Sequence, residues 1–202
     1  SLSDAFEFEE LTEKYMNEKV EEAMKNLQEL SKTIDKFRYL YDDLSENTNF
    51  SLKKNIENLI SLNFSRFRAH GIKLEFDCND DVIVYGNPSD FSQAIYNIIN
   101  NAFEIHTVRK NPEPYVFLRC QKNNDKVIIS IKDNAGGIDE DIKDKIFDLY
   151  SSTKEGLNNT GIGLYLTSLI IEKNMNGKID VVDEETGTVF NVSISVSSFK
   201  QM

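Results

Sequence analysis

The sequence predicts an α+β protein in which helices cover one face of a mixed β-sheet, with a long heptad-patterned helix in front of this two-layer sandwich. Three observations predict it. Residues 16–44 carry an unbroken apolar heptad, and residues 51–70, 88–107 and 164–173 repeat apolar residues at helical spacing. The segments between them alternate apolar and polar residues, as strands do. Interspersed helices and strands of this kind are typical of layered α/β architectures.

Composition narrows the function classes. The chain has 202 residues, enough for one full domain and an appendage, and 40% of them are hydrophobic, so it can build a core. The formal net charge of −11 disfavours binding to nucleic acid or to an anionic membrane surface. Cys78 and Cys120 lack the spacing of a zinc site, no apolar run approaches ~20 residues, and the N-terminus is acidic. These features indicate a soluble protein of the cytoplasm.

The first predicted element is a helix from Met16 to Leu44. Its apolar seam has two rows, which are Val20, Leu27, Ile34 and Tyr41 in one and Met16, Ala23, Leu30, Phe37 and Leu44 in the other. A repeat closer to 3.5 than to 3.6 residues favours packing on partner helices over packing on the chain's own globular part. We therefore predict a dimerisation helix in residues 1–48 and a globular domain in residues 49–202.

The globular domain is expected to start with a helix that is capped by Ser51 and ends before Gly71. Its predicted buried face consists of Ile56, Leu59, Ile60, Phe64 and Phe67. The alternation at 72–77 and the apolar run at 82–85 predict two strands that pair with each other.

Four further strands and two further helices are expected downstream. Pro88 marks the first turn of a helix that runs to about Thr107. Strands at 115–121 and 127–132 should form a hairpin. A glycine-punctuated stretch, 133–163, then leads into a helix at 164–173 and a closing strand pair at 178–183 and 188–196.

Polar residues gather on one face of the helix after Pro88. Asn97, Asn101 and Glu104 stand at positions i, i+4 and i+7 and should therefore stack. Asn carbonyl oxygens are hard neutral ligands that suit a Mg²⁺ whose other ligands are waters and substrate phosphates. Taken alone, this cluster fits a solvated helix face better.

A second cluster, Asp133-Asn134-Ala135-Gly136-Gly137, follows the strand at 127–132. A carboxylate at a strand end can accept a hydrogen bond from an exocyclic amine, and the two glycines permit the positive φ of a hinge. By composition alone, an ordinary turn is the simpler interpretation.

A third cluster, Thr160-Gly161-Ile162-Gly163, precedes the helix at 164–173. Glycines at a helix N-terminus leave amide N–H groups free to point at phosphate oxygens. A single Gly-x-Gly is weak evidence, and no strand precedes it directly as in a Rossmann fingerprint.

In this order and spacing, the three clusters resemble the N, G1 and G2 boxes of the histidine kinase catalytic domain. That domain has the Bergerat-type ATP-binding fold, which is shared with gyrase, a heat-shock chaperone and mismatch-repair ATPases. The resemblance runs from about Phe50 to Val196. Residues 146–154 are similar to the family's F box and lid, and Gly187-Thr188-Val189-Phe190 is similar to its closing strand.

The resemblance implies ATP and Mg²⁺ as cofactors and a role for each matching residue. Asn101 would coordinate the metal and Asn97 would support the nucleotide site, whereas Asp133 would bind the adenine amino group with Thr188 behind the base. Lys154 is the candidate phosphate-contacting cation. The full implied binding set is Asn97, Asn101, Asp133, Gly136, Gly137, Ile138, Phe147, Tyr150, Lys154, Thr160, Gly161, Ile162, Gly163, Leu164 and Thr188.

Within this set, Gly136 and Gly137 would hinge the lid, Phe147 and Tyr150 would anchor it, and Gly161 and Gly163 would approach the phosphates. The implied catalytic residues are Asn97, Asn101 and Lys154.

The resemblance also separates a kinase from a hydrolase. Hydrolysing relatives carry a water-activating glutamate four residues before the metal-binding Asn, and that position here is Asn97. Phosphoryl transfer mainly needs positioning and charge neutralisation, so a kinase works without such a base. Glu104 departs from the Lys that many members carry near the phosphates, and Arg109 or Lys110 is the candidate replacement.

By the same resemblance, the helix at 16–44 is similar to the second helix of a dimerisation and phosphoacceptor bundle. Neither His70 nor His106 has the sequence context of the acceptor histidine, so we interpret both as surface residues and expect a fragment that lacks the acceptor helix. The implied partners are ATP, the acceptor-His helix of the same kinase, a response regulator and a second copy of the chain. Segments outside this one are candidates for anchoring the full-length protein in the inner membrane.

Two other functions stay open at this point. One is a non-catalytic interaction module with a decayed nucleotide site, which the intact Asn101, Asp133 and glycines argue against. The other is an ATP hydrolase or a serine kinase of the anti-sigma type. The missing glutamate disfavours the hydrolase, and the long heptad helix disfavours the serine kinase.

Overall fold

The computed structural model describes residues 15–21, 23–24, 46–138, 140–143, 145–149, 161–184 and 186–196. The chain divides into two compact units, Ser1–Asp43 and Leu44–Met202. In the first unit, residues 15–21 and 23–24 are helical, and the side chains of Met16 and Val20 are exposed. The rest of the predicted heptad helix lies outside the described residues, so its seam stays a prediction. None of the described helices is long and apolar enough to cross a membrane.

The second unit alternates strands and helices along the chain. In order, its elements are β1 (Thr48–Ser51), α3 (Leu52–Ala69), β2 (Lys73–Cys78), β3 (Ile83–Gly86), α4 (Pro88–Val108), β4 (Tyr115–Asn123), β5 (Lys126–Asp133), α5 (Glu140–Lys143), α6 (Gly163–Leu169), the π-helical turn η1 (Ile170–Asn174), β6 (Lys178–Glu184) and β7 (Gly187–Ser195). The three helices predicted in this unit, the β4–β5 hairpin and the closing β6–β7 pair are all confirmed.

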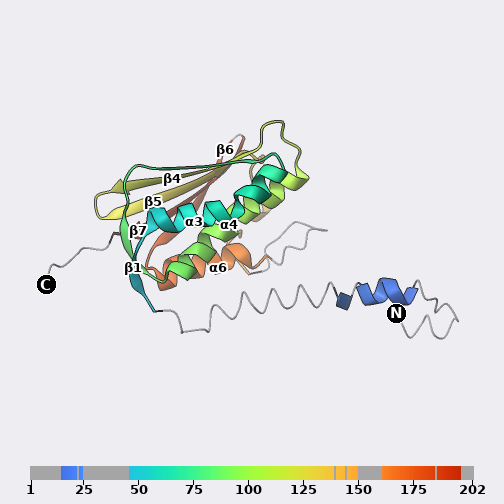
Figure 1. Cartoon of the computed structure of the whole chain (residues 1–202), viewed down its shortest axis with the longest axis horizontal. Coiled ribbons are helices and arrows are strands. Elements are labelled where there is room, and N and C mark those ends of the chain that lie inside the picture. The colour runs from blue at the N-terminus through green and yellow to red at the C-terminus, as the bar shows by residue number, and fades with distance from the viewer. Residues whose placement is uncertain are drawn as a thin grey trace. The chain divides into compact units, whose positions relative to one another are not determined.

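Five strands form a mixed sheet in the order β2-β4-β5-β7-β6. The β2–β4 pair is parallel and the other three pairs are antiparallel. The helices α3, α4 and α6 lie together on one face of this sheet (Figure 1). The predicted two-layer sandwich of a mixed sheet with helices on one face is therefore confirmed.

The expected pairing of the strands at 72–77 and 82–85 is wrong. β2 pairs with β4, whereas β3 forms a separate two-stranded antiparallel sheet with β1. Parallel neighbours need a long crossover, and β3 and α4 together provide it between β2 and β4. β1 was not predicted from the sequence, because Thr48-Asn49-Phe50 continues a polar stretch.

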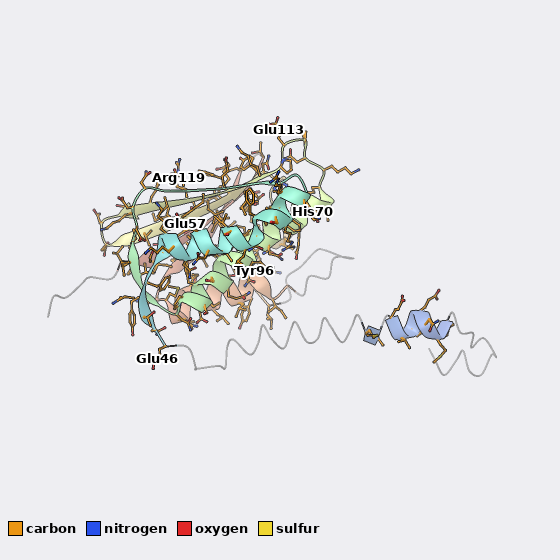
Figure 2. All side chains as sticks on the ribbon, viewed as in Figure 1. Glu46, Glu57, His70, Tyr96, Glu113 and Arg119 are labelled. Carbon is orange, nitrogen blue, oxygen red and sulfur yellow. The ribbon has the colours of Figure 1, made fainter. Side chains whose placement is uncertain are left out.

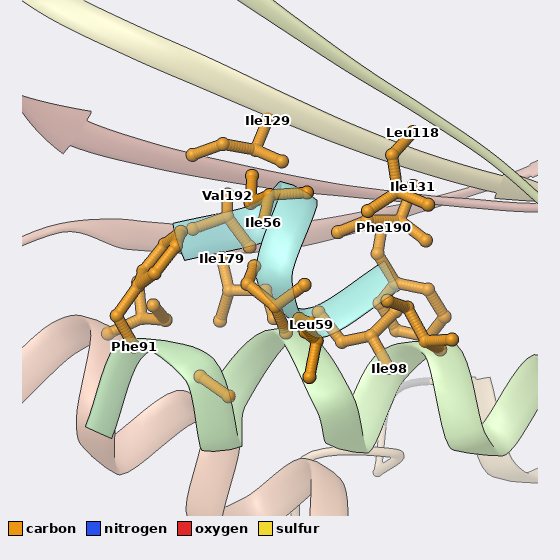
Figure 3. Packing of buried hydrophobic residues seen from close by; sticks show 14 of the residues in the cluster. Ile56, Leu59, Phe91, Ile98, Leu118, Ile129, Ile131, Ile179, Phe190 and Val192 are labelled. Carbon is orange, nitrogen blue, oxygen red and sulfur yellow. The ribbon is translucent and has the colours of Figure 1, made fainter. Parts of the chain in front are cut away.

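Apolar side chains from both layers meet between the helices and the sheet (Figure 3). α3 contributes Ile56 and Leu59, α4 contributes Phe91 and Ile98, and the sheet contributes Leu118, Ile129, Ile131, Ile179, Phe190 and Val192. Close packing of these side chains fixes α4 against the sheet, and α4 carries the candidate site residues Asn97 and Asn101.

The expectation that Phe64 is buried is wrong, because 49% of it is exposed. The buried residues of α3 are Leu52, Ile56, Leu59 and Phe67. At ~100° per residue, the centre of that face falls at Asn63 and not at Phe64. Asn63 fits there because its side-chain amide donates to the Leu59 carbonyl at 2.8 Å.

The two phenylalanines of α3 make a matched pair for a stability measurement. Phe67 is 1% exposed and its ring lies 5.0 Å from that of Phe103, so Phe67→Ala should lower the free energy of unfolding by ~3–5 kcal/mol. Phe64→Ala should lower it by about 1 kcal/mol or less. Urea denaturation measures both variants, and equal losses would contradict the assigned helix face.

Candidate functional site

The three polar clusters come from α4, the end of β5 and the start of α6. The helices α4 and α6 are in contact, and β5 is the central strand of the sheet. The fold therefore brings together residues that lie up to about seventy positions apart in the chain, as the hydrogen bond between Asn97 and Thr167 illustrates.

Asn97 connects α4 to the start of α6. Its side chain is buried, and its Nδ2 donates to the Gly163 carbonyl at 3.0 Å and to Thr167 Oγ1 at 3.3 Å. Its Oδ1 accepts from Gln93 Nε2 at 2.9 Å. The Thr167 hydroxyl itself donates to the Gly163 carbonyl at 2.9 Å. With its amide used in this way, Asn97 fixes the position of the first turn of α6.

Asn101 stands one helical turn after Asn97 and differs from it. Its side chain is half-buried and makes no hydrogen bond with another residue in the described part of the chain. Its carbonyl oxygen is therefore available as a neutral ligand. No group of three or more His, Cys, Asp or Glu side chains among the described residues could hold a metal ion, so a cation here would depend on ligands such as water and phosphate.

Asp133 ends β5 and is buried. Its Oδ1 accepts from the backbone N–H of Ala135 at 2.9 Å, and the backbone N–H of Thr188 donates to the same carboxylate. Burial raises the pKa of Asp133, while these N–H groups and the nearby His106 and Arg109 act in the opposite direction. Its environment is therefore that of an acceptor at a strand end, as predicted, beside the buried Thr188.

The residues 134–138, which we term the glycine turn, follow Asp133. Gly136 and Gly137 have φ of 90° and 76°, so the prediction of positive φ is confirmed. The turn is extensively hydrogen bonded, however. The Gly136 N–H donates to the Thr186 carbonyl at 3.1 Å, and Arg109 Nη1 lies 3.0 Å from each of the Ala135 and Gly137 carbonyl oxygens.

Gly187, at the start of β7, is required by a close backbone approach. A β-carbon placed on it would lie 2.0 Å from the Asp133 carbonyl oxygen and 2.7 Å from Asn134 Cα. Both are backbone atoms of neighbouring segments that cannot move aside independently. Gly187 thus lets the start of β7 approach the backbone of Asp133 and Asn134 closely, which brings Thr188 next to Asp133.

Part of the predicted lid is described. Ile146 is buried and Phe147 is half-buried, with its ring 6.4 Å from Phe190 of β7 at an interplanar angle of 81°. The segment that the sequence likens to the F box thus packs on the closing strand. Tyr150, Lys154 and Thr160 lie outside the described residues, and their implied roles stay predictions.

The turn before α6 contains a left-handed glycine. Gly161 has φ of 64°. Ile162 is buried, whereas Gly163 and Leu164 are half-buried. A β-carbon on Gly163 would lie no closer than 3.7 Å to the Asn97 side chain, so the fold itself leaves room there.

The interpretation of His106 as a surface residue is wrong, whereas His70 is exposed as expected. His106 is buried, its Nε2 lies 3.1 Å from the Tyr115 carbonyl oxygen, and its Nδ1 has no hydrogen-bond partner among the described residues. Burial lowers its pKa. His106 lies in the last turn of α4, which turns its side chain towards β4.

Sequence analysis missed two side chains that shape the site. Thr167 hydrogen bonds to both Asn97 and Gly163, and Asp183 accepts from the backbone N–H of Ile138 at 3.1 Å. Arg109 was named, but as a replacement phosphate cation. The contacts of Thr167 with Asn97, of Arg109 with Ala135 and of Asp183 with Ile138 each join residues at least 26 positions apart, so no local pattern signals them. Only the bond from Thr167 to Gly163 lies within one helical turn.

Comparison with known proteins gives concordant results. Residues 86–198 match the family described as "Histidine kinase-, DNA gyrase B-, and HSP90-like ATPase". Sporulation kinase E of Bacillus subtilis is 33% identical over 128 residues, which cover 62% of this chain and 16% of that kinase. The chain spans less than a third of the length of the curated relatives it matches.

Among solved structures, the catalytic domain of histidine kinase ThkA is similar with a TM-score of 0.66 and 28% identity, covering 74% of this chain and 95% of that one. ThkA in complex with the response regulator TrrA has a TM-score of 0.69 and 23% identity, covering 94% of this chain and 52% of that one. The second likeness concerns the fold alone.

Gly187→Ala should disrupt the contact between β7 and the glycine turn. The added β-carbon would overlap the Asp133 carbonyl, so we expect a loss of ~1–3 kcal/mol or more in the free energy of unfolding. Gly163→Ala is the matched control, since its β-carbon meets only ordinary contacts. Denaturant titration compares the two, and a Gly187→Ala variant as stable as the wild type would refute the close approach.

Proposed function

This chain belongs to the family of histidine kinase-, DNA gyrase B- and HSP90-like ATPases and contains a catalytic domain of the histidine kinase type. We propose that it binds Mg-ATP and transfers the γ-phosphoryl group to a histidine on a helix outside this chain. The observation that carries the proposal is the contact between two of the clusters, in which Asn97 of α4 donates to Gly163 and Thr167 of α6.

Asp133 is the proposed adenine-binding residue. A buried carboxylate is a strong acceptor for an exocyclic amine, and the backbone N–H groups of Ala135 and Thr188 hold it in one orientation. Guanine carries a carbonyl at the place of that amine, so the carboxylate would repel it. Asp133 thereby supplies affinity and selectivity for adenine.

Asn101 is the proposed protein ligand of Mg²⁺. Its amide is not engaged by other described side chains, and a single neutral ligand suits a cation that keeps waters and phosphate oxygens around it. When bound, the cation would neutralise charge on the phosphates during transfer. Phe147, packed on Phe190, and Lys154 are proposed to act from the lid side of the site.

Asn97 supports transfer to a protein acceptor over hydrolysis. An amide cannot take a proton from water, and both of its polar atoms are already hydrogen bonded within the protein. Transfer by positioning needs no such base. The nucleophile would be an imidazole that another helix brings to the γ-phosphate.

The proposed partners follow from this chemistry. They are ATP, the acceptor-His helix of the same kinase, a response regulator of the kind that the ThkA complex names, and a second copy of this chain joined through residues 1–48. The exposed Met16 and Val20 support a helix that packs on a partner. We place this part of the protein in the cytoplasm, where ATP and response regulators are available.

A nucleotide titration tests the binding site. A non-hydrolysable ATP analogue should bind saturably and more tightly with Mg²⁺, because the cation would bridge the protein and the phosphates. Asn101→Ala should remove this Mg²⁺ effect, whereas Asn100→Ala, at the neighbouring position, should keep it. Asp133→Asn should weaken binding roughly tenfold with or without Mg²⁺. Calorimetry of folded samples that shows no saturable binding would exclude a nucleotide site.

Transfer itself is tested by supplying the missing acceptor. The chain is mixed with a bundle fragment that carries a validated acceptor histidine and with γ-labelled ATP, and the label should appear on the fragment as phosphohistidine. Asn101→Ala should abolish the label at the same protein concentration. Label released only as free phosphate would contradict transfer and point to hydrolysis.

A further inference from the structure

The glycine turn is held from two sides by side chains of other elements. We propose that Arg109 and Asp183 are positioning residues that clamp residues 134–138 in one conformation before the nucleotide binds. The proposal rests on the proposed function, in which Asp133, directly before this turn, binds the adenine. It replaces the expectation that Gly136 and Gly137 form a flexible hinge.

Arg109 holds the turn from the helix layer. It is the C-cap of α4, and its own N–H donates to the Ile105 carbonyl at 2.8 Å, so its backbone is tied to the helix end. Its Nη1 donates to the carbonyl oxygens of Ala135 and Gly137, each at 3.0 Å. One cationic group thus spans both sides of Gly136, and such charge-assisted bonds are stronger than bonds between neutral groups.

Asp183 holds the turn from the sheet. It lies on β6, and its Oδ1 accepts from the Ile138 N–H at 3.1 Å. Its Oδ2 lies 3.7 Å from Lys143 Nζ, at the end of the short helix α5 that follows the turn. Asp183 therefore contacts the last residue of the turn and the first helix beyond it.

The two glycines leave the space that the clamp occupies. A β-carbon on Gly136 would lie 3.2 Å from Arg109 Nη1, and one on Gly137 would lie 2.6 Å from Asp183 Oδ1. The space beside Gly136 is thus occupied by Arg109, and the space beside Gly137 by Asp183. This arrangement gives the Gly-Gly pair a second physical reason besides positive φ.

The rest of the turn is equally well bonded. Asn134 accepts from the Tyr115 N–H at 2.9 Å and donates to the Glu113 carbonyl at 2.9 Å, while Asn111 Nδ2 donates to the Asn134 carbonyl at 2.7 Å. Figure 2 shows the loop with Glu113 at one end of the sheet. With the backbone of the turn held from the α4–β4 loop, β6 and the β6–β7 turn, binding needs little further ordering there.

If Arg109 clamps the turn, its effect on the affinities for ATP and ADP should differ from that of an arginine that binds phosphate. Because Nη1 already donates to two carbonyls of the turn, Arg109 should influence all adenine nucleotides equally. An arginine that contacts the γ-phosphate would instead favour ATP over ADP. The ratio of the two affinities therefore separates the clamp from the role that the sequence suggested for Arg109.

The test measures amide hydrogen exchange of Gly136 and Ile138 in the free chain and, separately, the affinities for ADP and for a non-hydrolysable ATP analogue. Arg109→Met should speed exchange at both amides and weaken both ligands by the same factor, roughly tenfold. Arg119→Met is the matched control. Arg119 pairs with Asp77 at 3.2 Å, on the sheet and away from the loop with Glu113 (Figure 2), so its loss should change neither readout.

Asp183 is tested by a conservative rescue. Asp183→Ala should speed exchange at Ile138 and weaken both ligands, whereas Asp183→Asn keeps an oxygen acceptor and should retain slow exchange. An ATP affinity that falls at least ten times more than the ADP affinity in Arg109→Met would overturn the clamp, as would unchanged exchange in Arg109→Met and Asp183→Ala. If the wild type binds neither ligand but exchange still accelerates in these variants, the proposed function fails and the clamp stands.

Discussion

A carboxylate buried at the end of a central strand must be given hydrogen-bond donors, and much of the site is arranged to meet that requirement at Asp133. One donor is the Ala135 N–H of the turn that follows, and another is the Thr188 N–H, which reaches Asp133 only because Gly187 lets β7 approach the backbone closely. An ionised group in this position without those donors would be strongly unfavourable. The close packing of β7 against the turn therefore also supplies a hydrogen-bond donor to the Asp133 carboxylate.

The helix α4 organises both ends of the candidate site. Asn97 in its middle fixes the start of α6, and Arg109 at its end holds the glycine turn, about 18 Å further along the axis. The apolar residues of α4 are packed into the core with those of the sheet (Figure 3). Its polar residues therefore occupy fixed positions, which is what a site that works by positioning requires.

Local sequence patterns were sufficient for the features that depend on neighbouring residues. The capped helices, the β4–β5 hairpin, the left-handed glycines and the strand-end Asp133 follow from short-range chemistry and are confirmed. Local patterns failed where distant segments decide. The pairing of β3 with β1, the burial of His106 and the contact of Asp183 with Ile138 depend on long-range packing. The roles of Tyr150, Lys154 and Thr160 stay predictions.

The small β1–β3 sheet has a mechanical consequence for the chain. Thr48 pairs with Gly86, and the next residue, Asn87, caps α4 by accepting from the N–H groups of Ser89 and Asp90. A load that arrives along the chain before residue 48 therefore enters at the pair beside the N-terminal end of α4. Because that pair lies at the end of a ladder of four residue pairs, tension would open the ladder one pair at a time and not all at once. Tension on the chain before Thr48 would therefore act on the β1–β3 ladder before it acts on α4.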